Sequence, residues 1–137
     1  MNDGGATIID SIMQLSGPNC EDAYHHLIEA DHAVIPYLVE AYQVEQEAAL
    51  RALLVEIIWQ HRVPETVEFL STALQDPAPE VWKAALDGLV ILGGSAAVCT
   101  LETVRCELLS DRQGRTVQME WIDEALQQIG ESLCHSP

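Results

Sequence analysis

Apolar residues recur every three or four positions along most of this chain, which is the spacing of one face of an α-helix. A first helix is predicted over residues 6–15, before the Gly17-Pro18 stop, and its apolar stripe comprises Ile8, Ile9, Ile12 and Leu15. Strict alternation of apolar and polar residues, which would indicate a half-buried strand, never persists. The pattern therefore predicts an all-α protein.

One pair of helices is repeated along the chain. The segments AVIPYL, ETVEFL and AAVCTL begin at Ala33, Glu65 and Ala96, so their starts lie 32 and then 31 residues apart. A helical stripe precedes each segment, formed in turn by Tyr24, Leu27 and Ala30, by Val55, Ile58 and His61, and by Leu86, Leu89 and Leu92. Because one amphipathic hairpin cannot bury its apolar faces alone, we expect the copies to stack in register around a shared core.

The stretch DPAPEVWKAALDGLVILGGSAAVCTLETV contains the whole repeat. It begins with the turn Asp76-Pro77, continues through one helix to a break at Gly93-Gly94, and ends in a second helix. This pattern resembles a HEAT repeat of the short bacterial kind, and the resemblance covers roughly residues 19–130. It implies an armadillo-like α-α superhelix, a right-handed stack of about four HEAT-like hairpins of which the last is incomplete.

Two positions depart from the family pattern. Lys83 stands where an arginine is common early in the first helix, and Arg62-Val63 occupies the place that Gly93-Gly94 takes in the next repeat. The glycines belong to GLVILGGS (88–95), whose outline is that of a phosphate-binding loop with Gly94 in place of the lysine. Without that lysine or a preceding strand, we interpret the glycines as a helix end.

The whole chain is expected to form one HEAT-like α-solenoid domain, 1–137. Its predicted parts are an N-terminal cap helix within 1–18, three hairpins over 19–109 and a C-terminal cap helix over 116–134. At this length a single shared core is expected to bury about two-thirds of the surface that the unfolded chain exposes.

Charge changes the picture of what the protein binds. There are 22 acidic and 6 basic side chains, which give a net charge of −16, and the first basic residue is Arg51. Such a field repels phosphate backbones and anionic lipids, which argues against nucleic-acid and membrane binding, and it attracts basic ligands. The alternative is that the acidity serves solubility alone.

The chain carries no sign of export or membrane insertion. No run reaches the roughly 18 apolar residues of a membrane span, and the opening MNDGGATIID has no basic residue. A cytoplasmic location is therefore expected. There the four cysteines, whose spacing fits neither a zinc site nor a disulfide scaffold, are expected to be reduced and mostly buried: Cys20, Cys99, Cys106 and Cys134.

The second helix of each hairpin carries the candidate binding residues. At about 100° per residue, Tyr37 lies roughly 200° from the buried stripe of its helix, and Phe69 and Thr100 align with it. The resemblance to HEAT repeats implies that these helices line the inner surface of the array. The predicted partner-binding set is Tyr37, Glu40, Glu65, Glu68, Phe69, Thr72, Thr100, Thr103 and Glu107.

This set predicts a non-enzymatic scaffold, or an inhibitor of the immunity type, that binds a basic protein partner. Aromatic residues are frequent binding hot spots, and charges around them speed association. Two alternatives stay open at this point: a neighbouring helix covers Tyr37 and Phe69, or a second copy of the chain occupies the same ridge. No cofactor is expected.

The competing hypothesis is an enzyme. Some HEAT-like proteins attach bilins and others bind iron, and Asp22, His26 and Glu29 share one helical face that could hold a metal ion, although a solvated polar face has the same composition. The His-Glu pairs of the iron-binding HEAT hydroxylases are missing from the sequence. His61 aligns with Leu92 on a buried stripe, so we predict a packed histidine there.

Overall fold

Helices alone make up the regular structure of residues 3–109 and 116–134, which are the residues that this computed structural model describes. No strand occurs in these two ranges, so the prediction of an all-α protein is confirmed. The elements are α1 (Asp3–Gln14), α2 (Cys20–Glu29), the 3-10 turn η1 (His32–Val34), α3 (Ile35–Val44), α4 (Ala48–Gln60), α5 (Thr66–Ala73), α6 (Pro79–Leu92), α7 (Gly94–Leu109) and α8 (Thr116–Cys134).

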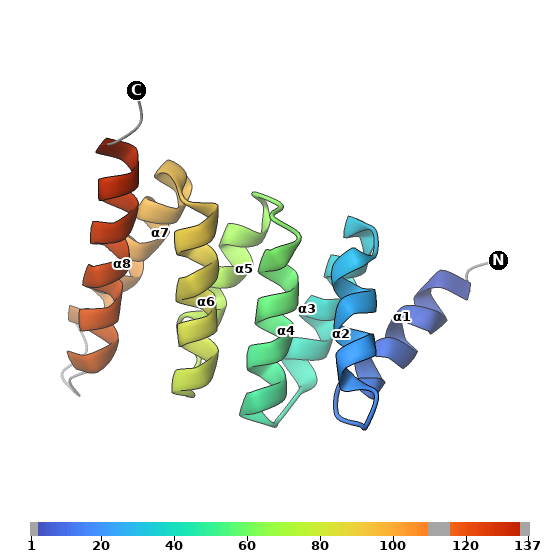
Figure 1. Cartoon of the computed structure of the whole chain (residues 1–137). Coiled ribbons are helices and arrows are strands. Elements are labelled where there is room, and N and C mark those ends of the chain that lie inside the picture. The colour runs from blue at the N-terminus through green and yellow to red at the C-terminus, as the bar shows by residue number, and fades with distance from the viewer. Residues whose placement is uncertain (1–2, 110–115, 135–137) are drawn as a thin grey trace.

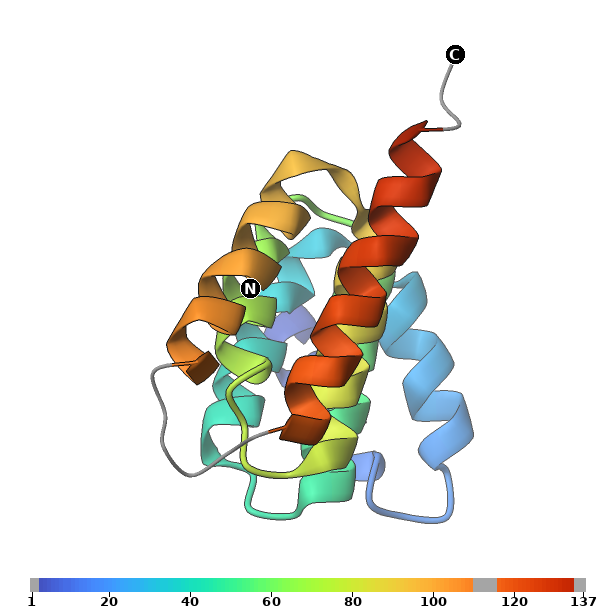
Figure 2. The same cartoon turned by 90° about the vertical axis from the view of Figure 1, so that its left-hand side faces the viewer.

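The helices form two layers. One layer holds α2, α4, α6 and α8 side by side, and the other holds α1, α3, α5 and α7 behind them (Figure 1). Turning the molecule by 90° separates the two layers and shows α7 and α8 at one end of the stack (Figure 2). Each helix contacts neighbours in both layers, which is the arrangement expected of an α-solenoid.

A continuous core runs between the layers. The predicted stripe residues Leu27, Val55, Ile58 and Leu89 are fully buried. Every helix from α2 to α8 contributes to this core, through Leu27, Leu38, Ile57, Leu70, Leu89, Leu101 and Ile122. No helix within the described ranges is long and apolar enough to cross a membrane.

The helix ends confirm the repeat register and show one strained position. α6 ends at Gly93, which has a positive φ of 59°, as the predicted glycine break requires. Arg62, which occupies the same place one repeat earlier, has a φ of 55° and is the one non-glycine residue with positive φ in the part of the chain that the structure describes. Its Cβ makes this left-handed conformation unfavourable by about 1–2 kcal/mol.

Arg62→Gly is expected to raise the free energy of unfolding by about 0.5–1 kcal/mol, because glycine adopts positive φ without strain but loses more chain entropy on folding. Urea denaturation of the purified protein measures this change. Arg62→Ala is the control, since it removes the same charge and keeps the strained Cβ. Equal stabilisation by the two variants would show that the charge of Arg62, and not its backbone, is responsible.

Candidate functional site

The predicted partner-binding residues lie on α3, α5 and α7, or next to them, in one layer of the stack (Figure 2). Their polar members are exposed to solvent: Glu40, Glu65, Glu68, Thr72, Thr103 and Glu107. Tyr37, Phe69 and Thr100 are half-buried. We call the surface formed by Tyr37, Glu40, Glu65, Glu68, Thr103 and Glu107 the acidic face.

Phe69 is not placed as the helical projection predicts. Its ring packs edge-to-face against the buried Tyr42, with ring centroids 5.2 Å apart and planes at 85°, and it adjoins the hydrophobic core. The projection is wrong here because α5 is wedged between neighbouring helices, so two of its sides are covered. The structure therefore leaves Tyr37 as the more available aromatic residue of the face.

The carboxylates of the acidic face have no ion-pair partner among the residues that the structure describes. Glu40, Glu65, Glu68 and Glu107 form no ion pair with any residue in 3–109 or 116–134. Within the same two ranges, the arginines that form ion pairs bind elsewhere: Arg51 to Asp76, and Arg105 to Asp123 across α7 and α8. The face therefore presents a negative potential to solvent.

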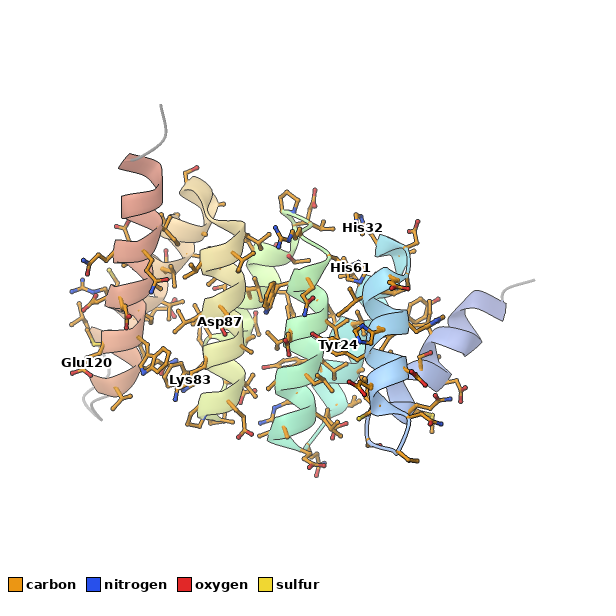
Figure 3. The ribbon with its side chains drawn as sticks, viewed as in Figure 1. Tyr24, His32, His61, Lys83, Asp87 and Glu120 are labelled. Atoms are coloured by element: carbon orange, nitrogen blue, oxygen red, sulfur yellow. The ribbon has the colours of Figure 1, made fainter. Side chains whose placement is uncertain are left out.

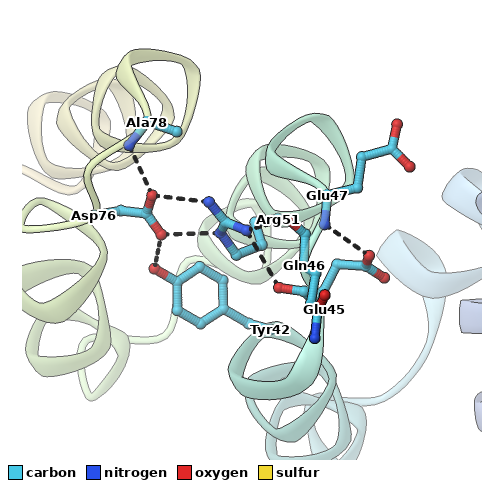
Figure 4. Close-up of polar contacts among 7 residues, drawn as sticks. All are labelled: Tyr42, Glu45, Gln46, Glu47, Arg51, Asp76 and Ala78. Carbon is cyan, nitrogen blue, oxygen red and sulfur yellow. Dashed lines mark hydrogen bonds and ion pairs between the residues drawn. The ribbon is translucent and has the colours of Figure 1, made fainter.

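A buried polar network links α3, one of the helices that carry this face, to α4 and to the turn after α5 (Figure 4). Asp76, at the turn before α6, accepts hydrogen bonds from the Tyr42 hydroxyl at 2.7 Å, from Arg51 Nε and Nη2 at 3.0 and 3.1 Å, and from the Ala78 amide at 2.9 Å. Arg51 Nη1 also donates to the backbone carbonyl of Gln46 at 2.8 Å. The network ties α3, α4 and the α5–α6 turn together.

Two pKa values in the network shift in opposite directions. Burial by itself would raise the pKa of Asp76, but hydrogen bonds from Arg51, Ala78 and Tyr42, with the charge of Arg51, lower it overall. Burial raises the pKa of Tyr42, and its hydrogen bond to the Asp76 carboxylate raises it further. The phenol therefore stays a donor while the carboxylate stays ionised. Sequence reasoning identified Asp76 only as a turn residue, because its partners lie 25 and 34 positions away.

His61 is a packed histidine, as predicted. It is buried, and its Nε2 lies 2.9 Å from the carbonyl oxygen of Leu27, which links α4 to α2. Burial lowers the pKa of His61, the Leu27 carbonyl opposes this, and His32 lowers it again. The two imidazoles meet edge-to-face with centroids 5.4 Å apart (Figure 3). A neutral imidazole therefore holds the two helices together.

The alternative metal site does not form. Asp22, His26 and Glu29 are exposed on α2, and no group of three or more His, Cys, Asp or Glu side chains among the described residues is arranged to hold a metal ion. The helical face that these three residues share is a solvent-exposed polar surface. Its carboxylates and histidine are also the residue types that bind metal ions, so the sequence alone could not separate the two possibilities.

The prediction of mostly buried cysteines is wrong. Cys20, Cys99 and Cys106 are exposed, and the side chain of Cys134 lies outside the described part. Cys99 and Cys106 border a shallow groove of about 430 Å³ along α7. The other residues that line this groove are Ser95, Val98, Glu102 and Thr103. This groove extends the acidic face and adds Glu102 to it, a residue that alignment with Tyr37 and Phe69 did not single out.

Comparison with known proteins finds a family match. A family model described as HEAT repeats matches residues 35–120, which is more than half of the chain. No curated protein and no solved structure shows a significant match.

Proposed function

Because the chain belongs to the HEAT repeat family, whose repeats generally mediate protein–protein interactions, we propose that it is a non-enzymatic module that binds a basic protein partner through the acidic face. One observation carries the proposal: Glu40, Glu65, Glu68 and Glu107 are exposed in one helical layer without a compensating cation among the described residues. A specific form of this function is an inhibitor that covers a basic active site.

Electrostatics supports a fast encounter. The net charge of −16 attracts cationic surfaces over distances of about one screening length, roughly 10 Å at 0.1 M salt. Charges at the rim of an interface act mainly on the association rate and on its salt dependence. The acidic face is therefore expected to determine how quickly the partner is captured.

Apolar contacts are needed for a lasting complex. Tyr37 and the apolar part of the α7 groove, Val98 above all, supply contact area next to the carboxylates. Phe69 contributes indirectly, since it packs on Tyr42 and positions α5. Tyr37→Ala is therefore a cleaner probe of binding than Phe69→Ala, which would also disturb the core.

Replacing Glu40, Glu65 and Glu68 by Gln is expected to slow association with the basic partner about three- to tenfold and to flatten its salt dependence. The partner is first isolated from native lysate at low salt, and association is then measured with the purified pair over a range of salt concentrations. Association is expected to slow because the substitutions remove three negative charges from the surface that attracts the basic partner.

The matched control removes three exposed carboxylates from the other layer, as Glu29→Gln, Glu80→Gln and Glu120→Gln on α2, α6 and α8. This control variant has the same net charge as the test variant, so any difference between their association rates is due to the position of the carboxylates that were removed. If both triple variants slow association equally, the effect belongs to overall charge and the acidic face is not the site. Binding that is insensitive to salt would contradict a basic partner.

A further inference from the structure

A second candidate site lies in the opposite layer, between α6 and α8. A groove of about 150 Å³ opens there, with Leu86 and Ala125 contributing apolar lining and Asp87, Trp121, Glu124 and Gln128 contributing aromatic and polar groups. None of these residues belongs to the acidic face. The groove combines one aromatic ring with two carboxylates, which is a chemistry suited to a cation.

The carboxylates of the groove are unpaired within the part of the chain that the structure describes. Asp87 and Glu124 form no hydrogen bond or ion pair within the described parts of the chain. The natural partner of Asp87 would be Lys83, one turn earlier on α6, since such pairs attract on a helix surface. Lys83 instead turns toward α8 (Figure 3). Partial burial raises the pKa of Asp87.

Trp121 already holds one cation of this protein. The Nζ atom of Lys83 lies 4.6 Å from the centroid of the Trp121 ring and 5.7 Å from that of Trp82. Trp82 meets Trp121 edge-to-face at 6.1 Å, which fixes the orientation of the exposed indole. Trp121 remains 41% exposed, and Lys83 is not among the residues that line the groove. The indole therefore has free surface on the groove.

We propose that the groove between α6 and α8 binds the guanidinium group of an arginine side chain from a protein or peptide. A guanidinium is planar, so it can stack on the Trp121 indole while its N–H groups donate to Asp87 and Glu124. The apolar lining suits the aliphatic stem of the side chain. The two carboxylates outnumber the single charge of Lys83, which leaves the groove locally negative.

This site is independent of the proposed function, because it uses a different layer of helices. A partner that engages both layers would be held at two places, and a partner of either surface alone would leave the other free. The two proposals can therefore fail separately.

The test titrates N-acetyl-arginine amide into ¹⁵N-labelled protein and follows the indole N–H signal of Trp121, assigned with Trp121→Phe. We expect a saturable shift that the neutral isostere N-acetyl-citrulline amide does not produce. Asp87→Asn combined with Glu124→Gln should weaken arginine binding about tenfold, because both charge-assisted hydrogen bonds are lost.

Two controls keep the result specific. Glu120→Gln removes a carboxylate of α8 that does not line the groove, and Glu65→Gln with Glu68→Gln removes two from the acidic face. Both should leave arginine binding unchanged. Equal shifts with citrulline, no saturable shift, or unchanged affinity in the Asp87/Glu124 variant would overturn the site. Equal affinity for N-acetyl-lysine amide would overturn its assignment to a guanidinium.

Discussion

Gly88→Ala is expected to lower the free energy of unfolding by about 2–3 kcal/mol, although alanine is the better helix former by about 1 kcal/mol. Gly88 is buried in α6 against Trp59 of α4. A Cβ at Gly88 would lie 2.6 Å from Trp59 Cγ and 2.8 Å from Trp59 Cβ, closer than the 3.0 Å that real Cβ atoms respect. The clash therefore outweighs the gain in helix propensity.

Rotation of the indole cannot relieve this clash, because Trp59 Cβ is attached directly to the backbone of α4. The two helices would have to separate, and α4 with α6 forms the most extensive helix contact in the described structure. Close packing of the core resists such a shift. This is the physical reason for a glycine at the centre of a helix, where it would otherwise be unfavourable.

Urea denaturation of Gly88→Ala beside Gly130→Ala tests the prediction. Gly130 also lies within a helix, α8, but a Cβ there meets no atom within 4 Å, so the same change should raise stability by up to about 1 kcal/mol. Gly88→Ala should also cost less in a Trp59→Ala background than in the wild type, because that change removes Trp59 Cγ and Cδ1 and leaves only Cβ of the clash. Stabilisation by both glycine variants would show that Trp59 does not constrain Gly88.

Asp76→Asn is expected to cost about 3–5 kcal/mol, because it leaves the guanidinium of Arg51 partly buried without its counter-charge. The amide also cannot accept all the hydrogen bonds that the carboxylate accepts from Tyr42, Arg51 and Ala78. Tyr42→Phe removes one of these bonds and should cost about 1 kcal/mol.

The pH dependence of this contribution follows from the lowered pKa of Asp76 in the folded protein. In the unfolded chain the carboxyl group has an ordinary pKa of about 4 and binds a proton first as the pH falls. The stabilisation is therefore complete above that value and is lost as the pH falls through the folded-state pKa. Asp76→Asn should lack this part of the acid sensitivity.

Denaturation at neutral and acid pH compares Asp76→Asn with Asp123→Asn. Asp123 also binds an arginine, Arg105, but the side chains of that pair are 41% and 52% exposed. Water screens such a pair, so its loss should cost less than about 1 kcal/mol. Equal losses in the two variants would mean that burial gives Asp76 no special role.

The apolar pattern predicted the architecture well because repetition supplies the same information several times. The 31-residue offset placed Gly93 and Arg62 at equivalent helix ends, and both have positive φ. Leu27, Ile58 and Leu89, each at the centre of a predicted stripe, are fully buried. Each helix has a side that must face its neighbours, so its period specifies which residues enter the core.

The candidate sites were predicted only in part. Exposed carboxylates such as Glu65 and Glu68 could be found from the helical projection, because one covered stripe leaves the opposite side in water. The position of Phe69 could not, since the projection assumes a helix covered on one side, whereas Phe69 of α5 also packs on Tyr42 of α3. The groove at Asp87 and Trp121 joins residues 34 positions apart and has no local signature.

The sequence by itself therefore determined the helices, their repetition, the central residues of the core and the negative charge, because period, turn chemistry and composition are local properties of the chain. Only the tertiary structure decided which polar groups meet. The Asp76 network, the Gly88–Trp59 contact and the pairing of Lys83 with Trp121 each join side chains from different helices. Which side chains meet in these contacts depends on how the helices pack against one another, and the sequence of a single helix does not determine that packing.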